Sequence, residues 1–275
     1  MDRDFNTLLA NLWTQGKFLC VGLDPGFEKI PESVRTSDVT TTFFAFTKAI
    51  VDATKDIVCA YKPNPAFYEA QGVEGWKALQ ATVDYIRAVA PEVPVILDAK
   101  RGDIGNTNVD YAKMAFDNFG ADAITVQPYA GGEALQPFFE RKNKGVFVLV
   151  RTSNKGAGEF QDLEINGEKL YKIVSRTAAE KWNGNDNCGV VVGTTYPKEI
   201  GEVRAIIGDL PILMPGVGAQ GGDLEESVRL GKNSRGTGFI VNVSRAVIFA
   251  SQGLDFAEAA RLKAQELHGA IQKAM

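Results

Sequence analysis

Histidine is nearly absent from this sequence, since His268 is the single one in 275 residues. This scarcity excludes histidine-based catalytic triads and the usual zinc sites, which depend on imidazole ligands. Acid–base chemistry must therefore come from lysine, aspartate or glutamate side chains. We expect no metal site, although carboxylates alone could still hold Mg²⁺.

Cysteine is also scarce, and its three positions do not form a pattern. Cys20, Cys59 and Cys188 are odd in number and far apart, and each lies within an apolar run. The spacing fits neither a metal site nor a disulfide framework. We interpret all three as buried thiols that contribute to packing.

The sequence contains neither a basic block nor a long apolar run. Its formal net charge is −4 with the charged residues mixed along the chain, which argues against binding to nucleic acid or an anionic membrane surface. No apolar run approaches the roughly 20 residues that span a bilayer. The first residues lack a basic segment followed by an apolar one, so we expect no signal peptide and a cytoplasmic protein.

What the sequence does contain is a repeat of about 30 residues, in which an apolar run precedes a helical pattern. After a short helix with Phe5, Leu8, Leu9 and Leu12 on one face, eight such runs follow, at 18–23, 57–61, 95–97, 123–126, 146–150, 190–192, 212–214 and 239–243. Runs this apolar are typical of parallel strands covered by helices. We predict a closed (β/α)8 TIM barrel in a single domain spanning residues 1–275. A doubly wound open sheet is the alternative.

Polar residues concentrate where the predicted strands end. Those positions hold Asp24, Lys62, Asp98, Lys100, Asp103, Ser153, Gln220 and Arg245. In barrels of this kind the active site forms from the loops at the carboxyl ends of the strands. The alternative is a set of solvated turns and ion pairs, but specific charges at this rim are not needed for folding.

The segment from Val95 to Thr107 dominates this set. Side chains alternate along a strand, so Asp98 and Lys100 should face the same side, with Asp103 following a glycine turn. Lys100 should stay protonated, because neighbouring carboxylates favour its charged form. A protonated lysine is a poor Schiff-base nucleophile, but it can stabilise and protonate a carbanion.

The last two strand ends predict a phosphate site. Glycines in the stretch 215–223 permit close approach of the backbone to an anion, and Arg245 offers a forked donor. Barrels often bind phosphate with these two loops. The alternative is a flexible glycine-rich connection. Residues 216–221 also fit G-x-G-x-x-G, but they lie late in the repeats and lack the acidic residue of a dinucleotide site.

Together these motifs resemble the orotidine 5′-phosphate decarboxylase family. The resemblance rests on Asp98-Ala-Lys100-Arg-Gly-Asp103-Ile-Gly-Asn-Thr107, on Gly22-Leu-Asp24 and on Pro215-Gly-Val-Gly-Ala-Gln220-Gly-Gly-Asp223. Lys62-Pro-Asn64 and Arg151-Thr-Ser153-Asn154 are similar to the longer bacterial subtype. The resemblance to the family extends from residue 22 to residue 245.

The resemblance implies a barrel homodimer that converts orotidine 5′-monophosphate to uridine 5′-monophosphate and CO₂ without a cofactor, in de novo pyrimidine synthesis. By the same resemblance Lys100 donates the proton to C6, and Asp98 lies beside the substrate carboxylate. Lys62 and Asp24 hold the ribose and the charge network.

The remaining roles follow from the resemblance as well. Asp103 and Thr107 would reach into the partner's site, Ser153 would meet the pyrimidine, and Gln220 and Arg245 would meet the phosphate. Ser244 departs from the glycine of many relatives. The long loop from Arg151 to Gly167 and the loop after the seventh strand are both candidates for a lid.

Two other functions compete with this interpretation. A Mg²⁺-dependent phosphosugar decarboxylase of the same suprafamily shares the Asp-x-Lys-x-x-Asp signature, but it would need an acidic ligand where Lys62 stands. A non-catalytic nucleotide-binding barrel would not need an ammonium group directed at one carbon. We therefore expect a cofactor-free orotidine 5′-monophosphate decarboxylase.

Overall fold

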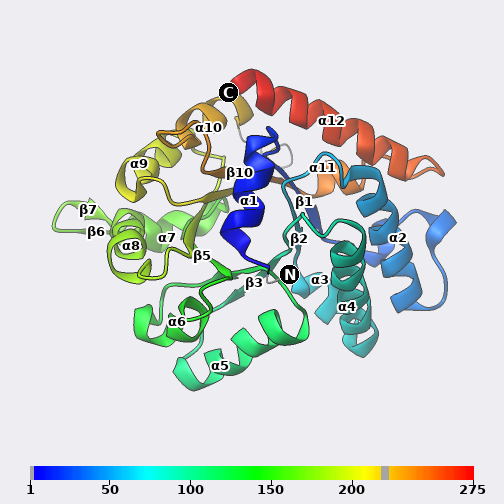
Figure 1. The fold of residues 1–275 in the computed structure, drawn as a ribbon, viewed down its shortest axis with the longest axis horizontal. Helices are drawn as coiled ribbons and strands as arrows, with labels where there is room; N and C mark the ends of the chain where they lie inside the picture. Colours follow the sequence, from blue (N-terminus) through cyan, green and yellow to red (C-terminus); the bar gives the residue numbers. More distant parts are fainter. Residues whose placement is uncertain (1–2, 218–222) are drawn as a thin grey trace.

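The chain folds as a closed ring of parallel strands surrounded by helices (Figure 1). The computed structural model describes residues 3–217 and 223–275. The strands of the ring are β1 (Leu19–Leu23), β2 (Ala60–Pro63), β3 (Ile96–Arg101), β4 (Ala123–Val126), β5 (Gly145–Arg151), β8 (Cys188–Val192), β9 (Ile212–Pro215) and β10 (Phe239–Val243). Their order is β2-β1-β10-β9-β8-β5-β4-β3. A parallel bridge between Tyr61 and Val95 joins the two ends, which confirms the predicted closed barrel.

Helices cover the outer face of this ring, and most of them connect successive strands. They are α2 (Val39–Thr54), α3 (Pro65–Glu69), α4 (Gly72–Val89), α5 (Gly105–Lys113), α6 (Gly131–Phe139), α8 (Leu170–Thr177), α9 (Pro197–Ile207), α10 (Leu224–Gly231), α11 (Arg245–Ile248) and α12 (Phe256–Ala274). Of these helices, α11 and α12 follow the last strand, β10. Within the two described segments, no helix has the length and apolarity needed to cross a bilayer.

The predicted leading helix is present as α1 (Phe5–Thr14), and it lies across one end of the barrel (Figure 1). Its N-terminus is capped by Asp4, whose carboxylate accepts a hydrogen bond from the amide of Thr7 at 2.8 Å. Phe5, Leu9 and Leu12 pack against the apolar residues inside the barrel. This end is thus closed by hydrophobic packing.

Side chains inside the barrel change from apolar to polar along β2, β3 and β10. Ala60, Ile96 and Ile240 belong to the inner hydrophobic cluster. Because side chains alternate, the next inward positions on these strands are Lys62, Asp98 and Asn242. The barrel interior is therefore a hydrophobic core at one end. At the carboxyl ends of the strands it is polar on β2, β3 and β10, whereas Leu149, Val191 and Leu213 line the second cavity on β5, β8 and β9.

The long loop predicted from Arg151 to Gly167 follows β5 and contains secondary structure of its own. It contains the short helix α7 (Gly158–Gln161) and a hairpin of β6 (Glu164–Ile165) and β7 (Glu168–Lys169). Asn166 and Gly167 form the turn with positive φ angles of 54° and 81°. Asn-Gly is a favoured pair for such a hairpin turn, so the local signal was present in the sequence.

The three cysteines are buried and free, as predicted. Cys20 and Cys59 face the barrel interior, and Cys188 lies in the layer between strands and helices. Burial raises the pKa of the Cys20 and Cys188 thiols to about 12. The thiolate is the reactive form, so these side chains serve packing rather than chemistry.

Candidate active site

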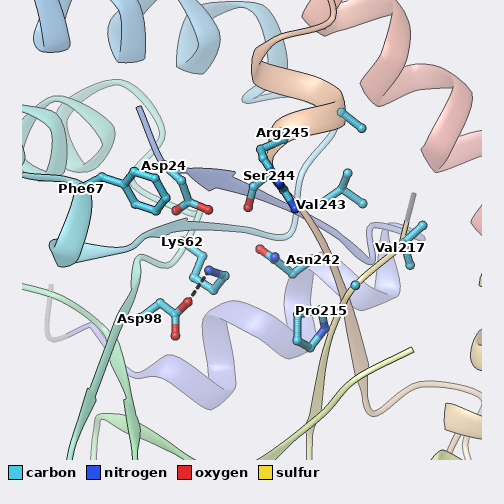
Figure 2. Close-up of a pocket in the computed structure, with 12 residues that line it drawn as sticks. Asp24, Lys62, Phe67, Asp98, Pro215, Val217, Asn242, Val243, Ser244 and Arg245 are labelled. Carbon is cyan, nitrogen blue, oxygen red and sulfur yellow. Dashed lines mark hydrogen bonds and ion pairs between the residues drawn. The ribbon is translucent and has the colours of Figure 1, made fainter. Parts of the chain in front are cut away.

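Two adjoining cavities open at the carboxyl ends of the strands. The first has a volume of about 260 Å³ and extends from Lys62 and Asp98 to Arg245 (Figure 2). The second has a volume of about 470 Å³ and extends from the same two residues to Lys100 and Ser153. Lys62 and Asp98 therefore lie where the two cavities meet.

Asp98 is the centre of a three-residue charge cluster. The amine of Lys62 on β2 lies 2.7 Å from Oδ2 of Asp98, and the amine of Lys100 lies 2.6 Å from Oδ1. The side chains of Lys62 and Asp98 are only 4% and 12% exposed, whereas that of Lys100 is 43% exposed. Lys100 is thus the more exposed cation of this cluster.

The charges of this cluster stabilise one another. Burial by itself would lower the pKa of Lys62, but the nearby charges of Asp98 and Asp24 outweigh burial and raise that pKa above its usual value. Burial would likewise raise the pKa of Asp98, yet the charges of Lys62 and Lys100 hold it well below its usual range. Lys62 and Asp98 are therefore both ionised at neutral pH.

An irregularity in β3 places Asp98 and Lys100 together. Leu97 pairs with Ile124 and Arg101 pairs with Val126, so three residues of β3 face the single residue Thr125 of β4. Lys100 adopts a φ angle of +48°, which is uncommon for a residue other than glycine. Simple strand alternation predicted the shared side of Asp98 and Lys100 but not this bulge.

From the neighbouring strand, Thr125 holds Asp98 and Lys100, two of the three residues in the bulge. Its hydroxyl donates a hydrogen bond to Oδ1 of Asp98 at 2.9 Å and accepts one from the backbone amide of Lys100 at 3.0 Å. The amide of Lys100 thus finds an acceptor although it has left the regular strand pairing. This buried threonine was not among the site residues predicted from the sequence.

Asp103 and Thr107 lie apart from this cluster in the same chain. Both are exposed, and neither lines the two cavities. The buried side chain of Asn108 binds both backbone groups of Asp103, at 3.1 Å to the amide and 2.6 Å to the carbonyl. The loop that carries Asp103 is therefore fixed, and the Asp103 carboxylate accepts a hydrogen bond from the amide of Ile104 at 2.7 Å.

Ser153 lines the second cavity from the loop after β5. Arg151 anchors this loop, because its guanidinium lies 2.6 Å from Glu199 on α9 and 3.1 Å from Asp162 beyond α7. Gln161 accepts a hydrogen bond from the amide of Thr152 at 2.9 Å. The loop is therefore held on both sides of Ser153.

The predicted phosphate residues are only partly within the described structure. Arg245 begins α11 and lines the first cavity, as does Gly216 after β9. Gln220 lies outside the described residues, so its predicted role stays a prediction. The described part of the site thus places a guanidinium and a glycine backbone at one end of the first cavity.

Asp24 and Asn242 also line the first cavity. Figure 2 shows the side-chain amide of Asn242 pointing toward the space between Asp24 and the pair formed by Lys62 and Asp98. Asn242 was not among the site residues predicted from the sequence. Its spacing of two from the inward residue Ile240 is the signal that would have found it.

Gly22 leaves space for Ser244 at the rim of this cavity. A Cβ atom at Gly22 would lie 1.8 Å from Oγ of Ser244 and 3.3 Å from Oδ2 of Asp24. We expect Gly22→Ala to lower the free energy of unfolding by about 1–3 kcal/mol, since it forces Ser244 to move.

Denaturant unfolding tests this expectation with a matched background. In Ser244→Gly the clashing side chain is absent, so adding Gly22→Ala should cost much less than it does in the natural sequence. An equal cost in both backgrounds would show that the contact with Ser244 does not determine the requirement for glycine.

A parallel barrel whose strand ends carry a buried, fully charged cluster beside two open cavities has the architecture of a (β/α)8 enzyme. Residues 17–261 match the family model described as orotidine 5′-phosphate decarboxylase / HUMPS family. The chain belongs to this family.

Individual relatives agree with that assignment. The chain is 48% identical over 264 residues to an orotidine 5′-phosphate decarboxylase of Cellvibrio japonicus, and the match covers 96% of each protein. It is 48% identical over 268 residues to the protein of that name from Azoarcus sp., covering 97% of this chain and 98% of the relative. The solved structure of Leishmania donovani OMP decarboxylase superposes with a TM-score of 0.84 at 39% identity, covering 98% of this chain and 99% of that one.

Proposed function

We propose that the chain decarboxylates orotidine 5′-monophosphate to uridine 5′-monophosphate and CO₂, as a cytoplasmic enzyme of de novo pyrimidine synthesis, without a metal or organic cofactor. Membership of the family and the names of its relatives support this reaction. The structural observation that most supports this proposal is the cluster of Lys62, Asp98 and Lys100, in which the exposed ammonium group of Lys100 lines an open cavity.

Decarboxylation at C6 requires a cation beside the carbon that loses its carboxyl group. When the bond between C6 and the carboxyl carbon breaks, the electron pair stays on C6 with little resonance stabilisation. Lys100 stabilises that charge and then transfers one ammonium proton to C6, after which solvent reprotonates the amine. Asp98 lies beside the departing carboxylate, and its ion pairs with Lys62 and Lys100 hold the Asp98 side chain in place.

One charge contact cannot account for the whole reaction. Two unit charges about 4 Å apart interact by about 4 kcal/mol at an effective dielectric constant near 20. Enzymatic accelerations correspond to roughly 8–23 kcal/mol. Binding of groups remote from C6 must therefore contribute, by positioning the substrate and excluding water.

The two cavities suit the two ends of such a nucleotide. We assign the phosphate to Arg245 and Gln220, the ribose to Asp24 and Lys62, and the pyrimidine to Ser153. Arg245 and Ser153 lie in different cavities that meet at the charge cluster. This arrangement would place the reacting carbon near Lys100, between the two anchored ends.

We further propose a homodimer in which Asp103 and Thr107 complete the site of the partner. Both residues are exposed and lie outside the cavities of their own chain. Ile104 and Val109 beside them are 68% and 54% exposed, which is a large exposure for aliphatic side chains. A second copy that covers these apolar side chains would bring its Asp103 and Thr107 to this chain's site.

The first test is a decarboxylation assay that follows the absorbance change of orotidine 5′-monophosphate in the presence of EDTA. We expect the purified protein to turn over the substrate at the same rate with and without chelator. Loss of activity in EDTA that returns with Mg²⁺ would instead support the magnesium-dependent alternative. Binding of the nucleotide without turnover would support a non-catalytic barrel.

The phosphate assignment is tested by Arg245→Ala. Removing the guanidinium takes away a charge-assisted contact, so we expect KM to rise by about 10- to 100-fold. Uridine, which lacks the phosphate, should bind the variant and the natural protein equally well. An unchanged KM would show that the phosphate binds elsewhere.

A further inference from the structure

Two buried oxygen atoms in the first cavity have no hydrogen-bond donor among the described residues. They are Oδ1 of Asp24 and Oδ1 of Asn242. Buried polar atoms are normally paired, and an unpaired one costs free energy, so each such atom calls for an explanation. Asp24 is assigned to the ribose under the proposed function, whereas that function assigns no role to Asn242.

The position of Asn242 makes a purely structural role difficult to support. It is 6% exposed and faces inward at the last layer of β10, where it pairs with Cys20 on β1 and Pro215 on β9. Pro215 has no amide hydrogen to donate. An apolar side chain would pack at this position without leaving a buried carbonyl oxygen unpaired.

The place of Asn242 in the cavity indicates what would pair with it. Arg245 lines the same cavity, and Lys62 and Asp98 line it where the second cavity begins. If the phosphate lies at Arg245 and the reacting base lies beyond Asp98, the part of the nucleotide between them is the sugar. The sugar of a ribonucleotide offers two hydroxyl donors, and the cavity holds two unpaired acceptors.

We propose that Asn242 is a further substrate-binding residue, whose side-chain oxygen accepts a hydrogen bond from a ribose hydroxyl and so selects ribonucleotides. This inference rests on the proposed function, because it takes the orientation of the nucleotide from it. Asp24 accepts the other hydroxyl.

The test measures the dissociation constants of uridine 5′-monophosphate and of its 2′-deoxy and 3′-deoxy analogues. The proteins are the natural chain and Asn242→Leu, which keeps a similar volume without the amide. We expect Asn242→Leu to raise the dissociation constant of uridine 5′-monophosphate by about 5- to 20-fold, which is the usual effect of losing one such hydrogen bond. One deoxy analogue, which lacks the hydroxyl held by Asn242, should bind both proteins equally.

The other deoxy analogue is an internal control, because it keeps that hydroxyl. Asn242→Leu should raise its dissociation constant by the same factor as that of the ribonucleotide. Arg245→Ala is the matched protein control, because it should leave the ratio between ribonucleotide and analogues unchanged. Should Asn242→Leu not fold, Asn242→Ala removes the same oxygen and gives the same comparison.

Equal weakening of all three nucleotides by the substitution, or none, would overturn the assignment of Asn242. That result is distinguishable from failure of the proposed function, in which the natural chain neither turns over orotidine 5′-monophosphate nor binds uridine 5′-monophosphate. In the latter case both proposals are wrong.

Discussion

Lys100→Ala is expected to lower the rate of decarboxylation by about 10⁴-fold or more. The variant loses both the charge that stabilises C6 and the proton that C6 receives, and each of these contributions is worth about 10²- to 10⁴-fold in enzymes. Binding of uridine 5′-monophosphate should change little by comparison, because its phosphate and sugar contacts remain. Single-turnover kinetics and circular dichroism measure the loss and confirm the fold.

Lys100→Arg is the matched control for this substitution. Its guanidinium keeps the positive charge but does not release a proton at neutral pH. We therefore expect Lys100→Arg to remain deeply impaired, so that charge alone does not restore turnover. Near-normal decarboxylation by Lys100→Ala would remove Lys100 from the mechanism altogether.

Mixing two inactive variants is expected to restore activity if the site is shared between two chains. Lys100→Ala and Asp103→Ala should each be strongly impaired as pure proteins. In an equal mixture of exchanging dimers, half of the dimers are hybrid, and one of the two sites in each hybrid carries both natural residues. Activity should therefore recover to about a quarter of that of the natural protein.

The hybrid experiment needs evidence that the subunits have exchanged, which differently tagged chains provide through co-purification. A mixture of Lys100→Ala with a second substitution on the same side of the site, such as Asp98→Asn, is the control that should stay inactive. No recovery in confirmed hybrids would place Asp103 outside the partner's site.

The sequence predicted the barrel well, because its strands are fully buried. Runs such as 146–150 and 239–243 match β5 and β10 closely, since strands covered on both faces need continuous apolar residues. The same alternation of side chains that fills the barrel brings Lys62 and Asp98 to its mouth. Both the fold and the charge cluster therefore follow from local patterns.

Features that depend on neighbouring strands could not be predicted in this way. The bulge in β3 becomes visible only from its pairing with β4, and Thr125 gains its place from that irregularity. The spacing of Asn242 from Ile240 indicates an inward position, but a single amide in an apolar run does not by itself indicate a function. Its unpaired oxygen becomes apparent only when the surrounding strands are in place.

The most direct test of the central claim is exchange of the C6 hydrogen of uridine 5′-monophosphate in D₂O, followed by proton NMR. If the ammonium of Lys100 delivers the proton to a carbanion at C6, the same group must remove that proton in the reverse direction. We predict measurable loss of the C6 proton signal with the natural protein and none above background with Lys100→Ala. Exchange at an equal rate in both proteins would contradict the account.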